Sequence, residues 1–147
     1  MSPAHLHLVL NHLPILAVPF GIALLAAGVL RHSRDLKLAA LATFVLAALL
    51  AVPVYLTGEP AEEQIEHRPG FSELYLERHE DLALYSLVLT AILGAASAAS
   101  LAIWRRRELP GTAVTALLLL SLLATASLGL TAAAGGPVGH AELRQGR

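Results

Sequence analysis

Histidine and carboxylate side chains are the groups in this chain that could do chemistry, and the histidines cluster at the ends of long apolar segments. Three of them lie in the stretch HLHLVLNHLP (residues 5–14), at the entrance of the first apolar run. His79 precedes another such run, and His140 follows the last one. Imidazole is a common metal ligand and a strong axial ligand for haem iron. These positions therefore predict a haem or metal site.

The composition restricts the cofactors and partners that the chain could bind. Its 147 residues include no cysteine, which excludes disulfides, thiolate metal sites, Fe–S clusters and covalently attached c-type haem. Apolar residues make up 56% and charged residues 14%, whereas soluble domains carry about 25% charged residues. The net charge is −1, and no basic cluster suits a phosphate backbone. We expect an integral membrane protein that contacts the lipid bilayer and binds no nucleic acid.

Four apolar segments are long enough to cross a hydrocarbon layer of roughly 30 Å. They cover residues 8–30, 38–57, 82–104 and 112–134. The first and second segments, and likewise the third and fourth, are joined by short connections, so these neighbours must be antiparallel. The sequence predicts a single all-α domain, an integral membrane up-and-down four-helix bundle. A long loop at residues 58–81 and a tail at residues 135–147 complete it.

Basic residues indicate the orientation of this bundle. The two short connections contain Arg31, Arg34, Lys37, Arg105, Arg106 and Arg107. Loops rich in Lys and Arg remain on the cytoplasmic side of a membrane. We expect a multi-pass protein of the bacterial inner (cytoplasmic) membrane with both termini on the outer, periplasmic side. Most of the histidines and carboxylates then belong to one outer layer.

The leading interpretation of this layer is a haem b site with His12 and His79 as axial ligands. The first and third helices of such a bundle are diagonal partners, so both rings could point into the core at similar depth. Glu80 could orient an imidazole by accepting its N–H. His140 would fold back over the bundle mouth on a flexible glycine-rich segment. The function would be electron transfer at the outer face, with a quinol or another respiratory redox partner.

Small residues recur at helical spacing in the last two apolar segments. In the third segment, in phase with His79, they are Ala83, Ser86, Thr90, Gly94 and Ser97. In the fourth they are Ser121, Thr125, Gly129, Ala132 and Gly136. Small residues allow membrane helices to pack closely. Alternatively, one stripe leaves room for a flat cofactor beside His79, which Ser86 and Thr90 would then line.

Two other interpretations compete with haem. A non-haem copper, iron or zinc centre would draw its nitrogen and oxygen ligands from His7, His12, His79, His140, Glu59, Glu63 and Glu80. The other is a non-catalytic accessory or assembly subunit of a respiratory membrane complex, in which the outer polar layer is a hydrogen-bonded plug. A homo-oligomer is compatible with each interpretation.

Four fragments of the chain carry a resemblance to a known group: LNHLP, PVYLTGEPAEE, GFSELYLERHE and GGPVGHAELR. They resemble a family of small, uncharacterised four-helix bacterial membrane proteins, related to a domain-of-unknown-function group that is sometimes fused to Rieske-type redox modules. The matching positions are Asn11, His12, Pro14, Thr57, Gly58, Glu59, Glu63, His79, Glu80, Gly135, Gly136, His140 and Glu142. The resemblance covers nearly the whole chain and, by association, implies a redox or metal function.

Overall fold

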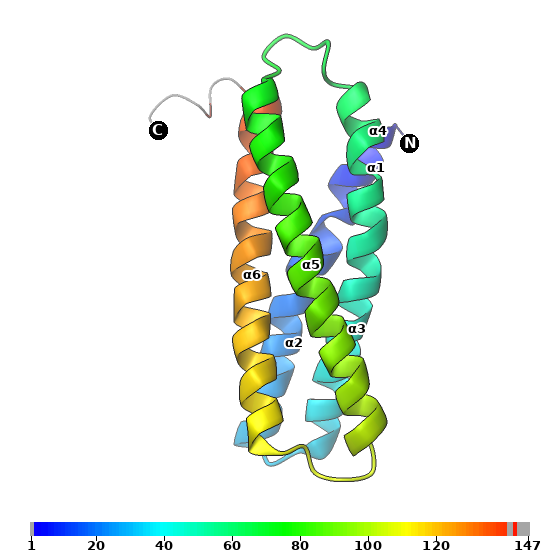
Figure 1. Cartoon of the computed structure of the whole chain (residues 1–147), viewed down its shortest axis with the longest axis vertical. Helices are drawn as coiled ribbons and strands as arrows, with labels where there is room; N and C mark the ends of the chain where they lie inside the picture. The colour runs from blue at the N-terminus through cyan, green and yellow to red at the C-terminus, as the bar shows by residue number, and fades with distance from the viewer. Residues whose placement is uncertain (1, 141–142, 144–147) are drawn as a thin grey trace.

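The chain forms long helices that run side by side along the length of the molecule (Figure 1). The computed structural model describes residues 2–140 and 143, and this part of the chain contains no strand. Its helices are α1 (Pro3–Leu10), α2 (His12–Leu30), α3 (Arg34–Leu56), α4 (Gly58–Glu63), α5 (Glu73–Trp104) and α6 (Gly111–Gly139). The predicted all-α class is confirmed.

Four helical stretches in the described residues are long and apolar enough to cross a membrane. They are Pro3–Leu30, Arg34–Leu56, Glu73–Trp104 and Gly111–Gly139. Each corresponds to one predicted segment. The first, third and fourth extend beyond the prediction at the end of the molecule where α1 begins and α6 ends, which we call the outer end (Figure 1). Glu, Leu and Arg favour helix in water as well as in lipid, so α5 begins before its apolar run.

α2, α3, α5 and α6 form a four-helix bundle in which successive helices run in opposite directions. α2 lies against α3 and α6, while α5 lies against the same two helices from the opposite corner. The two basic connections meet at the end opposite the outer end, the inner end (Figure 1). There, the Lys37 Nζ lies 3.4 Å from the Glu108 carboxylate and links the two connections.

Phe44 of α3 is the largest fully buried side chain of the bundle. Gly21 of α2 lies directly against the Phe44 ring, and Gly94 of α5 lies directly against Ala48, one turn further along α3. Glycine permits such close approach of membrane helices. The small-residue stripe of α5 faces the interior, with Ser86, Thr90, Gly94 and Ser97 buried.

The stripe predicted for α6 is wrong. Its buried residues from the first part of the helix are Val114, Leu117, Ser121, Ala124 and Leu128, which follow alternating spacings of three and four. Gly129 and Ala132 are exposed instead. The predicted stripe used mostly four-residue spacings, and such a row rotates away from a face that repeats every seven residues.

α1 and α2 belong to one apolar stretch that is interrupted at Asn11. Pro14 has no N–H to donate to the Leu10 carbonyl, and its ring crowds that carbonyl, so the chain turns here. α1 leaves the axis of α2 and packs against α4 (Figure 1). It buries no residue completely. Pro19 and Pro53 lie inside α2 and α3 without ending them.

The segment predicted as a flexible tail begins as helix. α6 continues through Gly135, Gly136 and Pro137 to Gly139. The Ser72 N–H donates to the Val138 carbonyl at 3.2 Å, which holds this end of α6 against the start of α5. Beyond His140, the predicted tail, including Glu142, lies outside the described residues except for Leu143.

Candidate functional site

At the outer end the bundle consists of two pairs of helices. α1 packs against α4, and the beginning of α5 packs against the end of α6 (Figure 1). We call these pairs the α1–α4 wall and the α5–α6 wall. No Cα atom of α1 or α4 lies within 8 Å of a Cα atom of α5 or α6. Contacts between the walls are therefore made by side chains.

His79 lies within the α5–α6 wall, half-buried. Its Nδ1–H donates to the Thr131 carbonyl of α6 at 2.9 Å. A Cβ atom on Gly135 would lie 3.2 Å from the His79 Cε1, so the ring rests on a position without a side chain. Because a carbonyl can only accept, the proton of a neutral His79 ring is on Nδ1 and the lone pair is on Nε2. Glu80, the acceptor expected from the sequence, does not fill this role.

His7 of the α1–α4 wall is held in a similar way. Its Nδ1 lies 3.1 Å from the Thr57 Oγ1. The Thr57 hydroxyl donates its own proton to the Val54 carbonyl at 2.8 Å, so it accepts from the imidazole Nδ1–H. The Nε2 of a neutral His7 therefore also carries the lone pair. His7 and His79 are close enough that positive charges on the two rings repel each other.

His12 is not placed opposite His79, which corrects the pairing expected from the sequence. The His12 side chain is exposed, and its Nδ1–H donates to the Leu8 carbonyl of α1, four residues earlier, at 2.6 Å. The prediction assumed a continuous first helix. In the structure it is His7, on α1, whose ring lies close to His79.

Ser86 and Thr90, expected beside a cofactor, are buried at different depths below His79. The Ser86 Oγ lies 2.7 Å from the Ser127 Oγ and 2.8 Å from the Thr131 Oγ1, which supports the residue whose carbonyl holds His79. Thr90 is one turn further from the outer end, and its hydroxyl has no hydrogen-bond partner among the described residues. His140 is exposed just after α6.

The seven residues expected to form a metal centre are not gathered into one group. Glu59, Glu63 and Glu80 are exposed. Within residues 2–140 and 143, no three His, Asp or Glu side chains are grouped so that they could hold a metal ion. Glu62 of α4, which sequence reasoning missed, shares a hydrogen bond with Glu80 of α5 when one of the two carboxyls holds a proton. This pair connects the two walls.

Partial desolvation, and then the proximity of Glu80, Glu66 and Glu59, raises the pKa of Glu62 above its ordinary 4.5. The folded protein therefore binds the Glu62 proton more tightly than the unfolded chain does. The stability that this proton contributes is complete below pH 4.5 and is lost as the pH rises through the folded-state pKa. We expect Glu62→Gln to reduce the fall in unfolding temperature between pH 4.5 and pH 7 by about 1–3 °C.

The control for this prediction is Glu63→Gln, because Glu63 is an exposed neighbour that does not contribute to the Glu62 shift. Its unfolding temperature should follow that of the wild type across the same pH range. Thermal unfolding monitored by circular dichroism measures both variants. If the unfolding temperatures of the two variants changed with pH in the same way, Glu62 would not interact with its neighbours as described.

Sequence reasoning also missed the groups that hold the two imidazoles. Thr57 and the Thr131 carbonyl accept from the rings, and the Gln64 Oε1 accepts from the Ala4 N–H at 2.9 Å, which ties the start of α1 to the residue after α4. Only Thr57 was indicated by the sequence, because it is one of the positions that match the similar family. A backbone carbonyl has no sequence signature, because every residue carries one.

Comparison with known proteins adds no relative from which a function could be transferred. No protein-family model, no curated protein and no solved structure matches this chain.

Proposed function

We propose that this protein binds haem b through His7 and His79 at the outer end of the bundle and transfers electrons there. The observation that carries the proposal is the pair of Nδ1 hydrogen bonds, to the Thr57 Oγ1 and to the Thr131 carbonyl. Such bonds fix the orientation and tautomer of a ligating imidazole and increase its basicity. They leave both Nε2 atoms for iron, and a six-coordinate haem needs no third protein ligand.

A position without a side chain lies next to each of the two rings. Gly135 lies against the His79 ring, and a Cβ on Gly58 would come within 4.0 Å of the His7 Cε1. The Cα atoms of the two walls lie more than 8 Å apart. Haem, when bound, supplies a one-electron couple. The residues of the chain hold and orient its ligands.

The proposed setting is the bacterial inner membrane, with the outer end on the periplasmic side. Four apolar helices support contact with the bilayer. The two connections at the inner end and the first turn of α3 together carry six Lys and Arg residues, as cytoplasmic ends of membrane helices do. A quinol or another respiratory component of the membrane would then be the redox partner.

A second candidate is a copper, iron or zinc ion at the same two imidazoles. It is favoured by the acidic group around Glu62, which comprises Glu59, Glu62, Glu66 and Glu80. Clustered carboxylates concentrate cations, whereas they repel the propionates of haem. An ion without a macrocycle needs ligands beyond two imidazoles. No third His, Asp or Glu side chain is grouped with these rings in the described residues, so a carboxylate would have to move in.

The test is an optical spectrum and an elemental analysis of the purified full chain, before and after incubation with haemin. The proposal expects a Soret band and about one haem per chain. Colourless protein with one equivalent of copper, iron or zinc would replace the haem proposal by the second candidate. Protein that holds neither, in both samples, would contradict both and favour an accessory role.

A further inference from the structure

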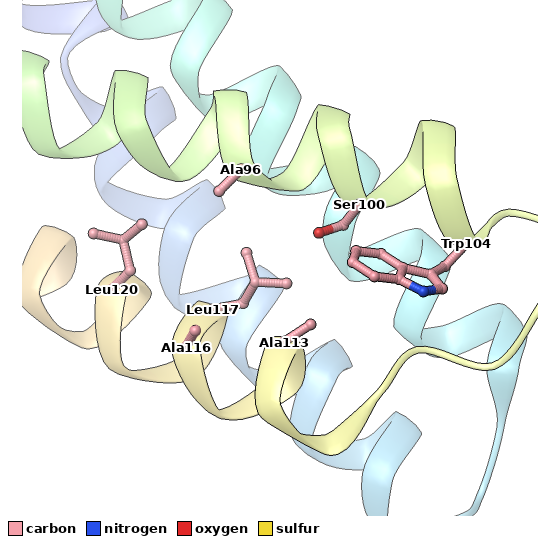
Figure 2. A pocket seen from close by; sticks show the side chains of 7 residues that line it. All are labelled: Ala96, Ser100, Trp104, Ala113, Ala116, Leu117 and Leu120. Atoms are coloured by element: carbon pink, nitrogen blue, oxygen red, sulfur yellow. The ribbon is translucent and has the colours of Figure 1, made fainter.

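The inner half of the α5–α6 pair carries a groove that is far along the helices from His79. Its sides are the small residues Ala96 and Ser100 of α5 and Ala113 and Ala116 of α6, and Trp104 lies at one end (Figure 2). The groove has a volume of about 200 Å³. Ala116 is exposed, so the groove opens to the surroundings of the bundle. In a bilayer, this depth is where acyl chains lie.

Positive charge follows directly after the residue that ends the groove. Arg105, Arg106 and Arg107 succeed Trp104 in the chain, and all three are exposed. They line a second hollow of about 440 Å³. In the described part of the chain, none of the three pairs with a carboxylate, and the adjacent Glu108 interacts with Lys37 instead.

The first turn of α6 adds donors on the other side of the groove. α6 starts at Gly111, and its N-cap residue Pro110 provides no side-chain hydrogen bond. The N–H groups of the first turn therefore have no capping side chain, and such groups attract anions. Ala113 belongs both to this turn and to the groove. Trp104 lines the apolar groove and directly precedes the three arginines in the chain, whereas the hollow that they line has no residue in common with the groove.

We propose that this groove binds an anionic phospholipid, with one acyl chain between Ala96 and Ala116 and the phosphate group at Arg105–Arg107. Trp104 suits the boundary between the two, because its ring is apolar and its N–H is a donor. A second copy of the chain fits less well. A two-fold axis along the membrane normal would bring the same arginines of both copies together, and like charges repel. The inference rests on the proposed bilayer setting, not on the His7–His79 site.

The test measures lipid binding to the purified full chain by native mass spectrometry, with phosphatidylglycerol and phosphatidylcholine of identical acyl chains. We expect one phosphatidylglycerol per chain and at least a tenfold preference for it over phosphatidylcholine. Each arginine near an anionic lipid surface contributes about a fivefold factor in affinity. The triple variant Arg105→Gln, Arg106→Gln, Arg107→Gln should therefore bind phosphatidylglycerol about 100-fold more weakly.

A second variant tests the apolar part of the groove. Ala116→Phe places a ring in the groove at an exposed position, so the bundle keeps its core and lipid retention falls. Matched controls are Ala126→Phe, exposed on α6 outside the groove, and Arg31→Gln, exposed in the other inner connection. Both should bind lipid like the wild type.

Equal retention of the two lipids, or unchanged binding in the arginine and Ala116 variants, would overturn the proposal. The proposal would also be overturned if the wild type formed a dimer without bound lipid and Ala116→Phe dissociated it, because the groove would then be an interface between two copies of the chain. Haem content measured on the same samples keeps the two proposals separate, because the inner-end variants should leave it unchanged.

Discussion

Replacement of His7 by alanine is expected to abolish stoichiometric haem binding, whereas replacement of His12 leaves it intact. His7 is half-buried and bonded to Thr57 across the α1–α4 wall, while His12 is exposed and bonded to the Leu8 carbonyl at the end of α1. Loss of a hydrogen bond to a ligand already lowers metal affinity about 10–100-fold. Loss of the ligand itself should lower haem affinity at least as much. His79→Ala should behave like His7→Ala.

His7→Ala and His12→Ala form a matched pair, because both replace a histidine close to the helix break at Asn11. Soret absorbance per chain, after incubation of each variant with the same amount of haemin, gives the occupancy. Far-ultraviolet circular dichroism establishes that the helices are retained. A loss in His12→Ala with full occupancy in His7→Ala would restore the pairing expected from the sequence and contradict the one proposed from the structure.

Gly94→Ala is expected to destabilise the bundle by about 1–3 kcal/mol. A Cβ atom at this position would overlap the Ala48 Cβ, and the Phe44 carbonyl oxygen would lie 3.6 Å from it. α3 and α5 would have to separate, and overpacking of a tight interface has a cost of this size. The displaced contact lies beside Phe44, at the centre of the core.

Gly129→Ala provides the opposite case. Nothing lies within 4 Å of a Cβ at this exposed position of α6. Alanine favours helix over glycine by about 1 kcal/mol, so this variant should be as stable as the wild type or more stable. Unfolding in mixed detergent and sodium dodecyl sulfate, followed by circular dichroism, compares them. Shifts of the same sign and size in both variants would exclude tight packing at Gly94.

The helical class, the four apolar stretches and their up-and-down order could be predicted from the sequence. Bilayer-length apolar runs and short connections are local features, and they leave few arrangements. The interior face of α5 could be predicted as well, because Ser86, Thr90, Gly94 and Ser97 recur at spacings of three and four residues in phase with His79. In α6 small residues lie on more than one face, so spacing alone selected the wrong stripe.

The partner of His79 could not be predicted, because its identity depends on the direction of α1. Pro14 indicated a kink, but its size and sense result from packing against α4 and from the bond between Ala4 and Gln64. The Thr131 carbonyl could not be predicted as the acceptor for His79, since only the contact between α5 and α6 distinguishes it from other carbonyls. The pairing of Glu62 with Glu80 could not be predicted either, because the acidic residues around Glu62 are similar to it in type and spacing.

The interruption at Asn11 separates a tightly packed frame from a short, lightly packed arm. The frame is the lower bundle, closed by the fit of glycines on Phe44 and Ala48. The arm is α1, which buries no residue fully and docks through a few polar bonds. Segments with so little buried contact undock at low free energy while the rest stays folded. Undocking of this arm is therefore the rearrangement that would admit the proposed haem while the frame stays folded.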